Sequence, residues 1–483
     1  MEVKVKLNCD KYRYHVFQII NLFYEFSNIV FVEKNNWDFN IEILSDKVII
    51  KHHSEVYQGK FDSCLKEKEN IRKIIFLYFS DKTCKKLPWG TLIGIRPSKI
   101  ALELMEKGEN YEGIIEYFRN HFCCERDKAE LCVNVAERER SFVNKQSRNI
   151  SLYVGMPFCP TRCLYCSFTS NHIGKLKSLV EPYLESLIYE IRQISNYIVK
   201  NGLNIECIYF GGGTPTSIDD EKFEKIVCEI YNNFIYGRKV KEFNVECGRP
   251  DSITLNKLNT MKKYGVHRIS INPQTMNNNT LEFIGRNHTV EDVKEKFYMA
   301  RKCGFTNINM DIIVGLPGEG INHIDKTCSE IEKLSPDSFT VHGMSVKRGS
   351  RLYENMINNT KYSAPDAKEL NLMYERTARA AKTLNMEPYY LYRQKNMVGN
   401  MENVGYAAND NFGLYNIEMI EEKQTIIGCG ADAVTKVVFL EENRLERHGN
   451  IKDIKEYINR TEEMVRKKIT LLNTLYGDFP ISD

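Results

Sequence analysis

The 483-residue sequence lacks any apolar run of the roughly 18 residues that a membrane-spanning helix needs, so we expect no membrane span. It also lacks a charge excess, because 67 Lys and Arg against 64 Asp and Glu leave a formal net charge of +3. That balance gives no electrostatic reason to expect nucleic acid as a partner. The first residues lack the apolar core of a signal peptide, and we therefore expect a cytoplasmic protein. In a reducing compartment its 15 cysteines are expected to be thiols or metal ligands, and an odd number excludes complete pairing.

The middle of the chain alternates between strand-like apolar runs and helix-like segments. The strand-like runs cover residues 151–156, 205–210, 242–247, 267–272, 307–315 and 338–344. Such alternation is typical of parallel strands joined by crossover helices. The sequence therefore predicts an α/β protein with six β/α units, a partial (β/α)6 version of the eight-unit barrel.

The two flanks differ from this middle region. We predict three domains, with boundaries at residues 1–148, 149–362 and 363–483. The first reads as an accessory α+β domain, with a β-α-β-β-α order over residues 1–85, and its expected role is substrate shielding or partner docking. The last reads as an α+β extension, helical at first and then with two strands, that is expected to contribute to a substrate pocket.

Three cysteines stand within eight residues, at Cys159, Cys163 and Cys166, in a C-x3-C-x2-C spacing. A disulfide with a spare thiol is disfavoured in a reducing compartment. A structural zinc ion needs a fourth ligand, and no C-x2-C or H-x3-H pair follows, although a distant ligand leaves this alternative open. A [4Fe–4S] cluster with three protein ligands would leave one iron open to a small molecule, and we favour this reading. Tyr165 is an aromatic placed to cover such a site.

A second group of candidates follows the predicted strands. Three glycines in YFGGGTPT, residues 209–216, come directly after a strand and would let the backbone approach a ligand. No Gly-Lys-Ser/Thr follows, so this is not a P-loop. Glu246 and Gln274 lie at strand ends, Arg286 follows in the next loop, and Asp311 lies deeper in its strand. Active sites of β/α barrels form at the carboxyl ends of the strands, where most of these residues fall.

The cysteine motif resembles the signature of the radical S-adenosylmethionine (SAM) superfamily. The strings LYVGMPFC, YFGGGTPT, NVECGRPD and NMDIIVGLPGE are similar to the group around oxygen-independent coproporphyrinogen III oxidase, and the flanks resemble its HemZ-type coproporphyrinogen dehydrogenases. The resemblance implies a radical SAM barrel with a [4Fe–4S] cluster on the three cysteines. SAM on the open iron would yield a 5′-deoxyadenosyl radical. The implied SAM contacts are Tyr153, Gly212, Gly213, Thr214, Glu246, Gln274, Arg286 and Asp311.

The same resemblance implies an oxidoreductase of porphyrin and haem biosynthesis. Its reaction would be the oxidative decarboxylation of two propionates of coproporphyrinogen III, giving protoporphyrinogen IX, with electrons from a low-potential flavodoxin or ferredoxin. No catalytic residue beyond the cluster ligands is assigned. Arg393, with Lys395 beside it, is our first candidate for gripping substrate carboxylates, and Arg249 and Arg162 are weaker ones.

Two departures from the oxidase pattern keep other functions open. Phe168 stands where the oxidases have a further cysteine, and Gly155 stands where they have a histidine. A haem chaperone with the same fold is one alternative. A radical SAM enzyme that acts on another tetrapyrrole is the other.

Overall fold

The structure is a computed structural model that describes residues 2–24, 28–33, 36–94, 96–143, 146–168, 170–345, 347, 349–352, 354, 365–394 and 397–477. It forms two compact units. The first comprises Met1–Glu137, Pro365–Asn371 and Leu391–Glu402, and the second comprises Arg138–Ala364, Leu372–Tyr390 and Asn403–Asp483. The three-domain division stays a prediction, and part of the expected C-terminal extension lies in the first unit. None of the described helices has the length and apolar character to cross a membrane.

The first unit is built on a five-stranded sheet in the order β2-β1-β3-β4-β5. Its strands are β1 (Val3–Leu7), β2 (Ile29–Phe31), β3 (Phe39–Ile43), β4 (Lys47–His52) and β5 (Glu55–Lys60). β1 runs parallel to β2 and β3, and β3, β4 and β5 pair antiparallel. The helices are α1 (Arg13–Ile20), α2 (Glu67–Thr83), α3 (Pro97–Glu106), α4 (Tyr111–Phe122) and α5 (Arg126–Glu139). The predicted hairpin and helices are present, whereas the short β2 and the largely exposed β5 were not predicted.

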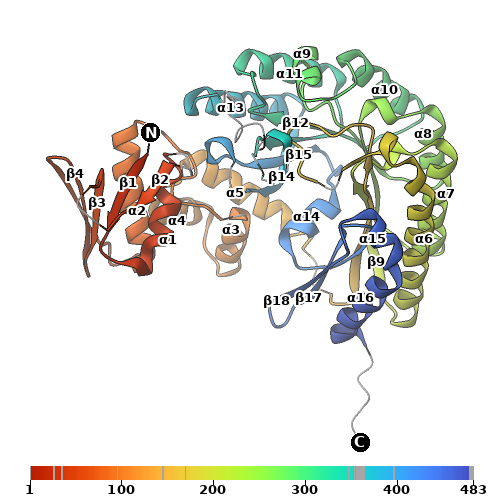
Figure 1. The fold of residues 1–483 in the computed structure, drawn as a ribbon, viewed down its shortest axis with the longest axis horizontal. Coiled ribbons are helices and arrows are strands. Elements are labelled where there is room, and N and C mark those ends of the chain that lie inside the picture. The colour runs from red at the N-terminus through yellow and green to blue at the C-terminus, as the bar shows by residue number, and fades with distance from the viewer. Residues whose placement is uncertain are drawn as a thin grey trace, which may run out of the picture. The chain divides into compact units, whose positions relative to one another are not determined.

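Six parallel strands form the centre of the second unit, as the sequence predicts. They are β6 (Asn149–Met156), β9 (Asn204–Gly212), β10 (Glu242–Gly248), β11 (Arg268–Ile271), β12 (Ile308–Val314) and β13 (Ser338–Gly343), each beside the next. The helices between them are α6 (Lys177–Lys200), α7 (Asp220–Ile230), α8 (Leu255–Lys263), α9 (Asn278–Phe283), α10 (Val290–Lys302) and α11 (Ile321–Leu334). They cover the outer face of the curved sheet (Figure 1). This is the predicted partial (β/α)6 barrel.

The residues after 363 extend this sheet at both edges. β16 (Thr425–Cys429) pairs parallel with β6, and β17 (Val434–Phe439) and β18 (Arg444–Gly449) follow antiparallel. At the other edge β15 (Asn403–Ala408) pairs antiparallel with β13, with β14 (Met386–Tyr392) beyond it. The remaining helices are α13 (Ala367–Thr383), α15 (Ile454–Asn459) and α16 (Thr461–Tyr476). Two strands were expected in the C-terminal extension after its helix. The structure has three there, β16, β17 and β18, and they continue one 11-stranded sheet.

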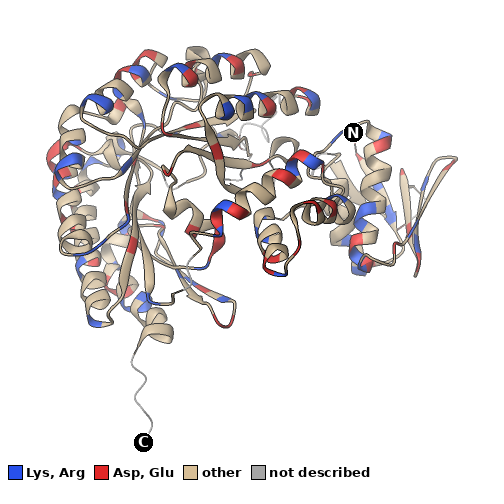
Figure 2. Ribbon diagram, turned by 180° about the vertical axis from the view of Figure 1, so that it is seen from behind, with Lys and Arg blue, Asp and Glu red and all other residues tan. Residues whose placement is uncertain are grey.

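The strands of the barrel present polar residues on alternate positions. In β10, Glu242, Asn244 and Glu246 alternate with the buried Phe243 and Val245. A strand turns successive side chains to opposite faces, so the apolar set meets the outer helices and the polar set faces inward. Figure 2 shows most charged residues on the outer helices and few on the strands. The few charged residues on the strands are therefore candidates for function.

Helix α14 (Leu414–Glu421) covers the inner face of the sheet at the amino ends of its strands. Glu242 accepts hydrogen bonds from the first amides of the helix, Leu414 at 2.7 Å and Tyr415 at 3.3 Å. Tyr415 stacks on Tyr209 of β9, with ring centroids 4.7 Å apart. Glu418 accepts hydrogen bonds from the Ser151 hydroxyl and, at 2.7 Å, from the Gln424 amide. The amino ends of β6, β9 and β10 are thereby closed, which leaves the carboxyl ends for chemistry.

Replacing Glu418 by glutamine tests this buried carboxyl. Glu418 is 2% exposed, and burial raises its pKa from 4.5 to about 8. The folded state therefore keeps a proton that the unfolded chain loses, so the free energy of unfolding falls as pH rises from 4.5 to about 8. Glu418→Gln removes this fall, and we expect it to be more stable than wild type at pH 9 by on the order of 2–4 kcal/mol. Urea unfolding between pH 5 and pH 9 measures the difference.

The matched control is Glu441→Gln, because Glu441 is exposed between β17 and β18. The free energy of unfolding of Glu441→Gln should depend on pH in the same way as that of the wild type. Parallel pH profiles for wild type and Glu418→Gln would contradict the assignment of a neutral Glu418.

Candidate active site

The three cysteines lie in one loop that follows β6. Cys159 ends the short strand β7 (Phe158–Cys159), and Cys163 and Cys166 follow it. The loop is fixed by backbone hydrogen bonds, since the Leu164 amide donates to Ile284 O and its carbonyl accepts from the Leu352 amide, both at 2.9 Å. All fifteen cysteines of the chain are free thiols, as expected.

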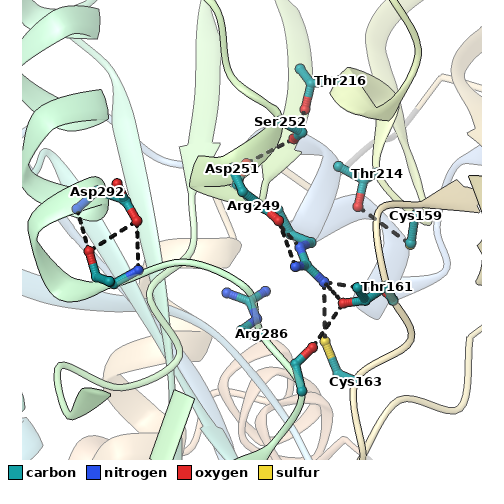
Figure 3. A network of polar contacts seen from close by, with 12 residues as sticks. Cys159, Thr161, Cys163, Thr214, Thr216, Arg249, Asp251, Ser252, Arg286 and Asp292 are labelled. Atoms are coloured by element: carbon teal, nitrogen blue, oxygen red, sulfur yellow. Dashed lines mark hydrogen bonds and ion pairs between the residues drawn. The ribbon is translucent and has the colours of Figure 1, made fainter. Parts of the chain in front are cut away.

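Each of these three sulfurs accepts a hydrogen bond from a side chain of the site. The pairs are Thr214 Oγ1 to Cys159 Sγ at 3.4 Å and Arg249 Nη1 to Cys163 Sγ at 3.9 Å (Figure 3), and Ser170 Oγ to Cys166 Sγ at 3.7 Å. Burial raises the pKa of the Cys159 thiol to about 12. Binding of iron requires the thiolate, and these donors stabilise negative charge on the sulfurs.

The arrangement suits a cluster better than a single ion. Within the described ranges, no three His, Cys, Asp or Glu side chains are grouped so that they could hold one metal ion. A single zinc ion requires its ligands to converge on one point. In an iron–sulfur cluster each cysteine binds a different iron, so the three sulfurs can stay further apart. The [4Fe–4S] cluster on these three thiols stays a prediction.

The glycine segment after β9 packs directly on the cysteine loop. The Gly213 amide donates to Met156 O at 2.6 Å, and the Thr214 amide donates to Phe158 O at 2.8 Å. A Cβ atom on Gly213 would lie 2.6 Å from Phe158 O and 2.9 Å from Cys159 Sγ. Gly212 has a φ of +112°, a conformation that favours glycine. Both glycines are thus required by the close approach of the two loops.

Two acids of the inner face stand in different electrostatic surroundings. Burial, followed by the charge of Asp311, raises the pKa of Glu246 to about 7, although Tyr209 donates to it at 2.9 Å. Burial alone would also raise the pKa of Asp311, but hydrogen bonds from His342 and Asn309 lower this pKa below its ordinary value. The Asn309 amide lies 2.7 Å from Asp311 Oδ1, and His342 Nε2 lies 3.5 Å from Oδ2. Asp311 is therefore an anion, and Glu246 is close to its titration point at neutral pH.

Two further predicted residues carry polar atoms with no hydrogen-bond partner in the described part of the chain. Gln274 has a φ of +66°, and its backbone pairs with Asp311 O and Ile313 N at 2.9 Å each. Its side-chain Oε1 is buried and unpartnered. Arg286 donates to Asn272 O, and its Nε is also buried and unpartnered. A buried polar atom without a partner is a candidate for a contact with a ligand. The amino-acid and nucleoside groups of SAM carry hydrogen-bond donors and acceptors that can pair with Gln274 Oε1 and Arg286 Nε.

Of the implied SAM contacts, Tyr153 stacks parallel to Tyr209 with ring centroids 6.2 Å apart. Tyr165 lies beside Arg286 and Cys163, and burial raises its pKa. Tyr209 and His342 were not among the predicted site residues. The alternation of inward positions along their strands is the signal that would have found them.

The residues predicted to hold substrate are placed differently. Arg393 belongs to the first unit, where it is buried, donates to Leu92 O and Asn400 O, and lies 4.7 Å from the centre of the Trp89 ring. Its role in substrate binding stays a prediction. Lys395 lies outside the described residues. The Arg162 guanidinium donates to Gly349 O at 2.5 Å.

Comparison with known proteins identifies relatives of the whole chain. Residues 153–331 match the model of the Radical SAM superfamily. The oxygen-independent coproporphyrinogen-III oxidase-like protein HemZ of Bacillus subtilis is 35% identical over 99% of both chains. The heme chaperone HemW of the same organism is 34% identical over 47% of this chain and 58% of its own length. The solved coproporphyrinogen III oxidase HemN of Escherichia coli shares the fold, with a TM-score of 0.53 and 19% identity, over 71% of this chain and 79% of that one.

Substituting Gly213 by alanine tests the contact between the glycine and cysteine loops. The added Cβ would clash with Phe158 O and Cys159 Sγ, and neither backbone can yield without moving a cysteine. We expect a cost of about 1–3 kcal/mol in stability and loss of most of the iron after reconstitution with iron and sulfide. Iron and sulfide content and the visible absorption of the reconstituted protein measure this.

Gly449→Ala is the control, because a Cβ there meets only Val434 at 3.9 Å. That variant should reconstitute like wild type. Full iron content in Gly213→Ala would show that the two loops do not depend on each other.

Proposed function

The chain belongs to the HemZ-like branch of the radical SAM superfamily, and on that basis we propose that it decarboxylates coproporphyrinogen III without oxygen. The observation that carries the proposal is the likeness to HemZ over the whole chain, flanks included, together with the site at the carboxyl ends of the strands. The family uses a [4Fe–4S] cluster and SAM. The natural electron donor would be a low-potential flavodoxin or ferredoxin.

The reaction balances as follows for each of two propionates. The propionate would give up CO2, one proton and two electrons in all to become a vinyl group. Bound SAM would supply the acceptor of that proton and both electrons and leave as methionine and 5′-deoxyadenosine, so the external donor would only prime the cluster. The task of the chain's own residues is to bind and orient the cluster and SAM. Cys159, Cys163 and Cys166 would hold the cluster, and the glycine segment with Glu246, Gln274, Arg286 and Asp311 would hold SAM.

Exclusion of water is a further task of these residues. The rings of Tyr153, Tyr209 and Tyr415 form a cluster with centroids 4.7 to 6.5 Å apart, and Glu246 accepts from the Tyr209 hydroxyl. Helix α14 supplies Tyr415 and closes the amino ends of the strands. Water is thereby kept from the inner face on that side, as a reaction through reactive intermediates requires.

Substrate carboxylates need cations at the carboxyl ends of the strands. Lys347, in the segment after β13, is half-buried, and its Nζ lies 5.4 Å from the ring centre of Phe168. Phe168 follows the last cluster cysteine and is 68% exposed. A flat exposed ring beside an ammonium suits a flat macrocycle that carries propionates. We assign the pair to substrate binding in place of Arg393.

A haem chaperone is the second candidate, and the surroundings of Gly155 favour it. A Cβ there would lie 3.3 Å from the Tyr153 ring and 3.4 Å from Cys429 O, so a side chain at this position packs tightly, and the histidine of the oxidase pattern is absent. The likeness to HemW covers 47% of the chain.

An anaerobic assay separates the two candidates. Reconstituted protein, SAM, dithionite and coproporphyrinogen III should yield 5′-deoxyadenosine, CO2 and protoporphyrinogen IX together. Cys163→Ala should yield none of them, because it lacks a cluster ligand. Stoichiometric haem binding without release of CO2 would support the chaperone and defeat the proposal.

Substitution of Lys347 by methionine tests the substrate contact. Loss of the ammonium removes a charge-assisted hydrogen bond, and we expect the KM for coproporphyrinogen III to rise about tenfold or more. Steady-state CO2 release at varied substrate concentration measures it. Lys455→Met on exposed α15 is the control and should keep the wild-type KM. An unchanged KM for Lys347→Met would remove Lys347 from the substrate site.

A further inference from the structure

Arg249 is a buried arginine beside the cysteine loop. It follows β10 and is 3% exposed. Its Nε and Nη2 donate to the two carboxylate oxygens of Asp251, at 3.0 and 2.8 Å. Its Nη1 reaches the cysteine loop, where it lies 2.6 Å from Thr161 Oγ1, 3.3 Å from Thr161 O and 3.9 Å from Cys163 Sγ (Figure 3). With these partners it is not available to grip a propionate.

The contacts of Arg249 join three loops. The Thr161 hydroxyl, which accepts from Arg249, donates in turn to Gly285 O at 2.8 Å. Gly285 directly precedes Arg286, whose guanidinium also acts on Cys163. Cys163 is therefore approached by two guanidinium groups. Cys159 and Cys166 instead receive hydrogen bonds from the hydroxyls of Thr214 and Ser170.

We propose that Arg249, oriented by Asp251, is a positioning residue that raises the reduction potential of the cluster through its hydrogen bond to Cys163. Reduction adds negative charge to the cluster, and a guanidinium donor on a ligand sulfur stabilises that charge. The Asp251 carboxylate fixes the planar guanidinium by a two-point contact. The negative charge of Asp251 also cancels part of the positive charge of Arg249 and so limits the rise in the reduction potential. The inference rests on the family's cluster and does not depend on the proposed substrate.

The test is a redox titration of the full-length reconstituted protein, followed by the EPR signal of the reduced cluster, without SAM or porphyrinogen. In Arg249→Gln the charged donor is lost, and we expect the ratio of reduced to oxidised cluster at a fixed potential to fall about tenfold, a downward shift of about 59 mV. In Asp251→Asn the arginine stays and its counter-charge is lost, so the potential should shift upward. A purely structural role would not give shifts of opposite sign.

Arg268→Gln is the matched control. Arg268 is a buried arginine of the same sheet, 2% exposed, at the amino end of β11, where it donates to Asn307 Oδ1 at 2.6 Å and Ser338 Oγ at 2.7 Å. Its replacement should leave the potential unchanged. The proposal is overturned if Arg249→Gln and Asp251→Asn shift the potential in the same direction or not at all, or if Arg268→Gln shifts it equally. If Arg249→Gln retains no iron, Asp251→Asn alone decides, an upward shift supporting the proposal and an unchanged potential overturning it.

Discussion

Two backbone hydrogen bonds hold the site together, those from the Gly213 and Thr214 amides to Met156 O and Phe158 O. They seat the cysteine loop on the glycine segment and bring the Thr214 hydroxyl to Cys159. The approach is so close that a Cβ at position 213 would overlap a carbonyl oxygen and a cluster sulfur. Two motifs some fifty residues apart in the sequence thus form one structure, and the other site residues gather around it.

The inner face of the sheet divides into two ends with different roles. At the amino ends, Glu242 caps α14 and Ser151 donates to Glu418, while Glu418 Oε1 and Gln424 Oε1 are buried without a partner in the described part of the chain. At the carboxyl ends, Gln274 Oε1 and Arg286 Nε are buried without partners in the described part of the chain. Unpaired buried polar atoms are costly, so a ligand that pairs with them would stabilise the folded state as it binds. The unpaired atoms at the carboxyl ends lie at the edge of the sheet where β/α barrels bind their ligands.

The local features of this fold and site could be predicted from the sequence. The six parallel strands were visible as apolar runs, and the cysteine and glycine motifs were visible as short spacings. The pairing of β16 with β6 was not visible in the sequence, because the alternation of side chains within a strand does not show which strand lies beside it. Arg393 was predicted to bind substrate from its charge, and the sequence does not show that it lies against the Trp89 ring. The contact of Arg249 with Thr161 was not visible either, since Thr161 comes from another loop.

The C-terminal strands lie close to position 155, where the oxidase pattern has a histidine. Because β16 runs parallel beside β6, its end brings Cys429 O to 3.4 Å from the place where a Cβ of residue 155 would stand. Tyr183 donates to Gly155 O at 2.7 Å and holds the backbone there. A side chain at position 155 would therefore pack closely against this strand. Any proton transfer at this end of the sheet must use other groups, and Glu246, whose pKa burial raises to about 7, can hold or release a proton near neutral pH.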